Sequence, residues 1–87
     1  MTQFDKLLNR VLSGRSDANI NFEELRALLG RFDFNERIKG DHYIFYRKDV
    51  TEIINIQPKG GKAKPYQVKQ VRNLILKYKL GETNEEL

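Results

Sequence analysis

A single histidine, His42, is the residue in this chain best suited to proton transfer near neutral pH. It lies in the segment KGDHYIF (residues 39–45), where a tight turn is expected to meet a strand. Residues 53–81 then contain seven lysines and arginines and no acidic residue. Isolated histidines more often pack against a strand than react, so His42 by itself does not establish a site. An imidazole beside a one-sided basic surface is nevertheless what a metal-free ribonuclease requires.

RNA carries its own nucleophile, the 2′-hydroxyl group, so an enzyme that cleaves it has only to position the phosphate and move protons. His42 is therefore the predicted general acid or base, and nearby cations are predicted to stabilise the charge that grows on the phosphorus-bound oxygens. The residues predicted to contact RNA come from the turn, the strand and the basic segment: Lys39, Gly40, Tyr43, Arg47, Lys59, Lys62, Lys64 and Lys69. Asp41 is placed to orient the ring if it belongs to the turn, because adjacent strand residues point to opposite faces.

Aromatic residues follow His42, and they are candidates both for the core and for stacking with bases. Phe45 is predicted to lie in the core, whereas Tyr43 and Tyr46 are left open between the two roles. The Gly60-Gly61 loop is predicted to contact phosphate together with the N-terminus of the helix behind it. The alternative is that these glycines only let the chain cross from sheet to helix.

Other catalytic classes find little support in the sequence. The chain has one histidine, no cysteine and no cluster with metal-ligand spacing, so neither a metal nor another cofactor is expected. Gly60-Gly61 lacks the remaining residues of a nucleotide-binding phosphate loop. Ser13 and Ser16 are far from His42 in sequence, which argues against a serine nucleophile.

Length and charge indicate how many domains, which cellular location and which type of partner to expect. The 87 residues have room for one small domain. No apolar run approaches the ~20 residues that span a membrane, and the N-terminus has no signal-peptide pattern, so a cytoplasmic protein without membrane contact is expected. The net charge is +4, and the acidic residues are confined to residues 5–52 and to the tail from residue 82. This segregation favours a polyanionic partner, either a nucleic acid or an acidic protein.

Sequence signals for helices occur before residue 31 and after residue 64. Thr2 is a predicted N-cap for a first helix that ends at Gly14, and residues 13–19 are predicted to form a loop. Asn21 is a predicted N-cap for a second helix that ends at Gly30. Pro65 opens the last helix, in which the buried stripe is Val68, Val71, Leu74, Ile75 and Tyr78 and the outward residues are Lys69, Arg72 and Lys79.

Three strands are predicted between the second and last helices, at residues 34–39, 42–47 and 51–57. Gly40-Asp41 forms the first turn between them and residues 48–50 form the second. The fold class is therefore α+β, with a three-stranded antiparallel sheet packed by helices on one face in two layers and with the order α-α-β-β-β-α. Residues 1–80 are predicted to form this single domain, and residues 81–87 an acidic flexible tail.

Three segments, in order, resemble the HicA toxin family of bacterial type II toxin–antitoxin systems. They are GDHYIF (residues 40–45), INIQP (54–58) and GKAKPYQVKQVR (61–72), and residues 16–22 look like the branch with an extra N-terminal helix. The resemblance covers about residues 4–80. It implies a fold like the double-stranded-RNA-binding domain and an mRNA interferase with His42 as the catalytic residue. It also implies a partner antitoxin of the HicB type that covers the active site.

The chain departs from the family pattern at two positions. The family usually has serine before the histidine, where this chain has Asp41, and a second histidine after the third strand is absent at Gln57-Pro58-Lys59. A carboxylate beside the scissile phosphate would repel it. The alternative to an active toxin is therefore a catalytically weak or inactive module that binds RNA or its antitoxin on the same fold. A further alternative is an interaction protein whose basic face docks an acidic partner.

Overall fold

The structure is a computed structural model, and it describes residues 2–80; the predicted acidic tail at 81–87 lies outside the described residues. The elements in chain order are α1 (Gln3–Ser13), the short 3₁₀ helix η1 (Asp17–Asn19), α2 (Phe22–Arg31), β1 (Asn35–Lys39), β2 (His42–Arg47), β3 (Val50–Ile56) and α3 (Pro65–Tyr78). This order confirms the predicted α+β fold. Within the described part of the chain, no helix is long and apolar enough to cross a membrane.

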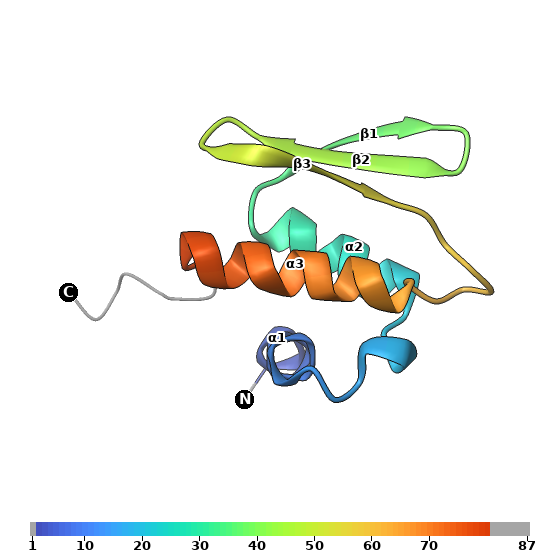
Figure 1. Cartoon of the computed structure of the whole chain (residues 1–87), viewed down its shortest axis with the longest axis vertical. Helices are drawn as coiled ribbons and strands as arrows, with labels where there is room; N and C mark the ends of the chain where they lie inside the picture. Colours follow the sequence, from blue (N-terminus) through green and yellow to red (C-terminus); the bar gives the residue numbers. More distant parts are fainter. Residues whose placement is uncertain (1, 81–87) are drawn as a thin grey trace.

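The three strands form one antiparallel sheet in the order β1-β2-β3. Helices α2 and α3 lie against one face of this sheet, and α1 lies on their far side, away from the strands (Figure 1). The prediction of two layers was therefore incomplete, because α1 adds a third. Within residues 2–80, no helix lies on the opposite face of the sheet.

Alternation along the strands sorts side chains between the helix layer and the open face. Phe45 of β2 is paired with Ile54 of β3, and the two residues are only 1% and 0% exposed. Their neighbours Tyr46 and Ile53 point the other way and are 42% and 64% exposed. The core prediction for Phe45 is therefore confirmed, and Tyr46 lies on the open face of the sheet.

Local capping signals determine where the first two helices begin. The Thr2 hydroxyl accepts a hydrogen bond from Asp5 N, and the Asp5 carboxylate accepts one from Thr2 N, so a capping box is present. Asn21 and Glu24 form a second capping box at the start of α2. Both starts were predicted from sequence, since a capping box involves residues only three positions apart.

The predicted end of α2 at Gly30 was wrong. The helix continues to Arg31, and Asp33 adopts the left-handed conformation with φ 66°. Asp33 N donates to Gly30 O and Phe34 N donates to Leu29 O, which is the Schellman arrangement. The short polar side chain of aspartate tolerates this conformation better than most residues do.

The prediction that Arg72 points outward was also wrong. Its side chain is only 16% exposed, and its guanidinium donates to the Asp17 carboxylate at 2.9 Å and to Val11 O at 3.2 Å. Arg72 thus ties α3 to the end of α1 and to η1, a segment predicted to be a plain loop. A basic residue at an outward helical position finds a partner here only because α1 packs behind α3.

A second polar contact joins α3 to the sheet. Glu52 of β3 accepts hydrogen bonds from Lys77 Nζ at 2.7 Å and from the Tyr78 hydroxyl at 2.6 Å. These bonds, the one from Lys77 first, lower the pKa of the Glu52 carboxyl to about 2.

Replacing Glu52 by glutamine is therefore expected to lower stability at neutral pH and to have no effect at very low pH. A carboxyl whose pKa is depressed in the folded state stabilises the fold above its unfolded pKa of about 4.3, and this contribution disappears as pH falls toward 2. The urea midpoints of wild type and Glu52→Gln should differ at pH 7 and converge as the pH approaches 2. A difference that is the same at both pH values would contradict the ionic origin of the contact.

Candidate active site

His42 begins β2 directly after a two-residue turn made of Gly40 and Asp41. Lys39, the last residue of β1, is the cross-strand partner of His42, and Gly40 has the positive φ of 62° that the first position of a type II′ turn requires. Asp41 belongs to the turn, so strand alternation does not direct its side chain away from the histidine. Its Oδ1 lies 3.7 Å from His42 Nε2.

The imidazole of His42 is held by a contact across the sheet. His42 Nδ1 lies 3.2 Å from Asn55 Oδ1 on β3, and the imidazole side chain is 49% exposed. An amide oxygen can only accept a hydrogen bond, so this contact requires a hydrogen on Nδ1. Nε2 is then the unprotonated nitrogen of the neutral ring, and it is available as a base.

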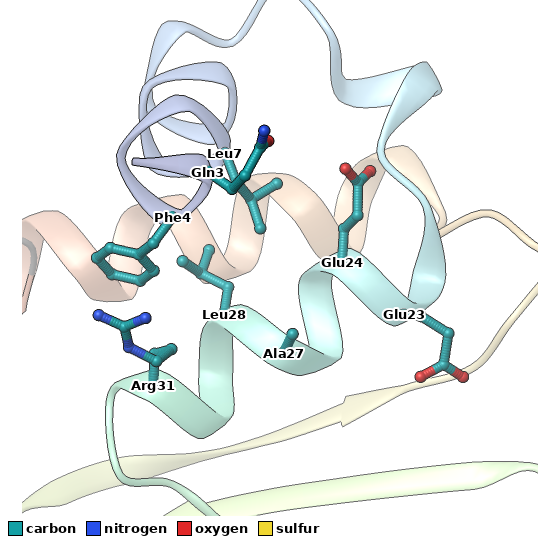
Figure 2. A pocket seen from close by; sticks show the side chains of 8 residues that line it. All are labelled: Gln3, Phe4, Leu7, Glu23, Glu24, Ala27, Leu28 and Arg31. Atoms are coloured by element: carbon teal, nitrogen blue, oxygen red, sulfur yellow. The ribbon is translucent and has the colours of Figure 1, made fainter. Parts of the chain in front are cut away.

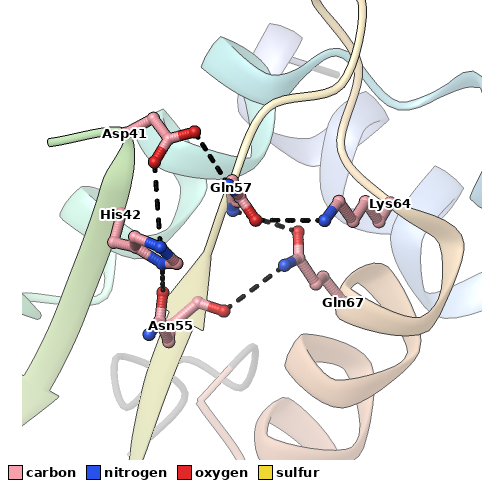
Figure 3. A network of polar contacts seen from close by, with 6 residues as sticks. All are labelled: Asp41, His42, Asn55, Gln57, Lys64 and Gln67. Carbon is pink, nitrogen blue, oxygen red and sulfur yellow. Dashed lines mark hydrogen bonds and ion pairs between the residues drawn. The ribbon is translucent and has the colours of Figure 1, made fainter.

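A chain of polar contacts links His42 to the start of α3 (Figure 3). Gln57 Nε2 donates to Asp41 Oδ2 at 2.8 Å, and Lys64 Nζ donates to Gln57 Oε1 at 3.1 Å. The hydrogen bond from Gln57, with smaller contributions from the charges of His42 and Lys64, holds the pKa of the Asp41 carboxyl below its usual range. Asp41 is therefore an anion at any pH at which His42 would work.

Gln67 is the buried support of this chain of contacts. It is 2% exposed on the inner side of α3, where its Oε1 accepts from Gln57 N at 3.3 Å and its Nε2 donates to Asn55 O at 3.4 Å. Its amide thus bonds to the backbone on both sides of Ile56, as a neighbouring strand would. It fixes the two residues that contact His42 and Asp41.

Sequence reasoning did not identify Asn55, Gln57 or Gln67 as site residues. One signal was present, because Gln67 lies one residue before Val68 and four before Val71, on the apolar stripe of α3. A polar side chain in such a stripe needs a buried hydrogen-bond partner.

Residues 59–62, in the basic loop between β3 and α3, form a defined turn. Lys59 and Lys62 exchange backbone hydrogen bonds of 2.9 and 3.1 Å around Gly60 and Gly61, whose φ values of 60° and 79° are typical of a type I′ turn. Gly61 O accepts from Phe22 N at 3.0 Å, which attaches the turn to the start of α2. Lys59 and Lys62 are consequently exposed on a rigid support, next to the first turn of α3, which contains no acid.

The other predicted RNA-contacting residues are not gathered around His42. Arg47 is at the opposite end of β2, about 16 Å along the strand, and its guanidinium is held by Phe32 O and Asp49. Tyr43 points toward the helices, with its ring 4.7 Å from that of Phe22. Lys69 lies further along α3 in a shallow groove that Glu52 also lines.

A larger apolar groove of about 490 Å³ lies elsewhere, between α1 and α2 (Figure 2). Phe4, Leu7, Ala27 and Leu28 line it, with Arg31 over the Phe4 ring. None of the residues that line it belongs to the network around His42. Among residues 2–80, no three His, Cys, Asp or Glu side chains are grouped so that they could hold a metal ion.

No family model, no curated protein and no solved structure matches this chain. The geometry of the site and the resemblance of the three sequence segments are therefore the basis of the functional proposal.

Proposed function

We propose that this protein is a toxin-type endoribonuclease that cleaves mRNA without a metal ion, with His42 as the general acid or base. The observation that carries the proposal is the arrangement of the imidazole. His42 is half exposed at a sheet corner, is oriented by Asn55, and is connected through Asp41 and Gln57 to Lys64. A positioned, accessible imidazole beside cations is the minimum that RNA cleavage requires.

The proposed reaction is an attack of a ribose 2′-oxygen on the adjacent phosphorus. His42 Nε2 removes the 2′-hydroxyl proton, the new P–O2′ bond forms, and the P–O5′ bond breaks. The departing 5′-oxygen takes its proton from a lysine or from water, since the chain has no second histidine. The products are a 2′,3′-cyclic phosphate and a 5′-hydroxyl end.

The cations near the site are proposed to hold the substrate phosphates. Lys59 and Lys62 are exposed on the anchored turn, and Lys39 is the cross-strand partner of His42. Lys64 already donates to Gln57, so its proposed role is to hold Asp41 and Gln57 in place as well as to add positive charge. A HicB-type antitoxin that covers His42 is the proposed protein partner.

The proposal is tested by incubating purified protein with a long unstructured RNA in the presence of EDTA. Wild type is expected to cut the RNA and to leave cyclic-phosphate ends. An otherwise identical substrate with 2′-deoxyribose at the cleaved position is expected to remain intact at that site, because it lacks the nucleophile. Cleavage of the deoxy substrate at that position would contradict the proposed chemistry.

The second candidate function is a catalytically weak or inactive module that binds RNA or its antitoxin. The specific observation in its favour is the Asp41 carboxylate, which is an anion 3.7 Å from the nitrogen that would remove the proton. A negative charge there repels the scissile phosphate.

Replacing Asp41 by serine is therefore expected to raise the rate of RNA cleavage by roughly tenfold, because the substitution removes this repulsion. The measurement is the single-turnover rate of wild type and Asp41→Ser on the same RNA. Asp49→Ser is the matched control, since Asp49 lies in the turn at the other end of β2. An Asp41→Ser rate well below that of wild type would instead make Asp41 a positioning residue for His42.

A further inference from the structure

The open face of the sheet carries basic, aromatic and apolar side chains. In β1, the residues that alternate away from the helices are Asn35, Arg37 and Lys39, since Glu36 between them bonds to Arg26 of α2. In β2 they are His42, Ile44 and Tyr46, and in β3 they are Thr51, Ile53 and Asn55. One continuous surface therefore combines cations, an exposed aromatic ring and exposed apolar groups.

The strand residues on this surface include no acid, because both strand acids point the other way. Among residues 35–39, 42–47 and 50–56 the acids are Glu36 and Glu52, and they are bonded to Arg26 and to Lys77 on the helix side. Within residues 2–80, neither Arg37 nor Lys39 forms an ion pair. Their charges are thus available to an anionic partner.

His42 belongs to this open face and not to the helix side. Its ring contacts Asn55, which alternates with the buried Ile54 and Ile56 and is itself exposed. An RNA strand that approached only from the helix side would not reach the face of the sheet on which His42 lies. The substrate must therefore extend onto the open face at this corner.

We infer that the open sheet face binds the single-stranded part of the RNA substrate that flanks the cleaved bond. Tyr46 is the stacking platform for a base, and Arg37 and Lys39 contact phosphates between it and His42. Aromatic rings on an exposed sheet stack with unpaired bases, which a duplex does not present. The inference deepens the proposed function, since it rests on RNA being the substrate, and it assigns single-stranded RNA as the substrate class.

The test is equilibrium binding of a short fluorescent RNA that carries 2′-O-methyl groups and cannot be cleaved by a 2′-oxygen. The single strand is expected to bind more tightly than the matched duplex. Tyr46→Ala should weaken binding of the single strand by about 5- to 150-fold, the range expected for one stacked base. Tyr46→Phe should retain the affinity, because the ring and not the hydroxyl makes the contact.

The salt dependence tests the phosphate contacts separately. Arg37→Ala should reduce the slope of log affinity against log salt by about 0.7, the value for one phosphate contact with a single strand. Arg15→Ala is the matched control, since Arg15 is an exposed arginine in the loop after α1, and its slope should equal that of wild type. Circular dichroism of each variant verifies the fold.

Unchanged affinity in both Tyr46→Ala and Arg37→Ala would overturn the inference and would leave this face to a second copy or to a partner protein. Tighter binding of the duplex would overturn it as well and would place RNA on the helix side. Because the probe is not cleaved, the outcome is independent of catalysis. Tyr46-dependent binding by a protein that does not cut RNA would contradict the proposed function and would support only the assignment of this face as an RNA-binding surface.

Discussion

The His42→Ala variant is expected to lose RNA cleavage by about 10²–10⁴-fold while keeping its fold. The loss follows from the role proposed for Nε2, which removes the 2′-hydroxyl proton. Among residues 2–80, the ring makes polar contacts with Asn55 and Asp41, and its side chain is 49% exposed. A surface substitution of this kind changes stability by no more than about 0.5 kcal/mol.

The measurement is the single-turnover cleavage rate in EDTA, with the thermal midpoint recorded for the same preparations. Asn55→Ala is the informative companion, because Asn55 touches the ring and has no proposed contact with the reacting atoms. It should lower the rate less than His42→Ala does, and added imidazole should restore cleavage only in the His42→Ala protein. Full activity of His42→Ala would remove His42 from the mechanism.

The second large effect is expected in the core. Phe45→Ala should lower the free energy of unfolding by about 3–5 kcal/mol, since Phe45 is 1% exposed and lies between the sheet and the helices. A domain of this size has a total stability of roughly 4–13 kcal/mol, so the variant should lose a large part of it. Urea denaturation followed by circular dichroism measures the change.

Tyr46→Ala is the matched control for this substitution. The two aromatic residues are neighbours in β2 but point to opposite faces, and Tyr46 is 42% exposed. Its removal should cost less than about 1 kcal/mol of stability. Similar losses in the two variants would contradict the assignment of the helix side as the core. Comparison of Phe45→Ala with Tyr46→Ala also separates loss of the fold from loss of RNA binding.

The sequence by itself determined the elements and their order. The capping pairs at Thr2 and Asn21 act over three residues, and Pro65 marks the start of α3 by its own geometry. The alternation around Phe45 defines which side of β2 is buried. These features depend on residues close together in the chain, so a single sequence contains the information needed to predict them.

The C-terminal end of α2 could not be predicted from the local sequence alone. Gly30 is the stronger stop signal, yet the helix continues and Asp33 takes the left-handed position. The core is the reason, because Phe32 and Phe34 are each 7% exposed on either side of Asp33. The burial of these two aromatic side chains outweighed the tendency of Gly30 to end the helix.

Only the tertiary structure decided what surrounds His42. Asn55 lies in β3, Gln57 directly follows that strand and Gln67 lies in α3. They meet Asp41 and His42 because antiparallel pairing and helix packing bring these segments together. Such contacts join residues 10 to 16 positions apart, through side chains that carry no distinctive sequence pattern. The sequence identified the imidazole and the cations. The packing of α3 against β3, on one face of the sheet, determined which of them form one site. Within residues 2–80 no helix covers the other face, so the site is open on that side.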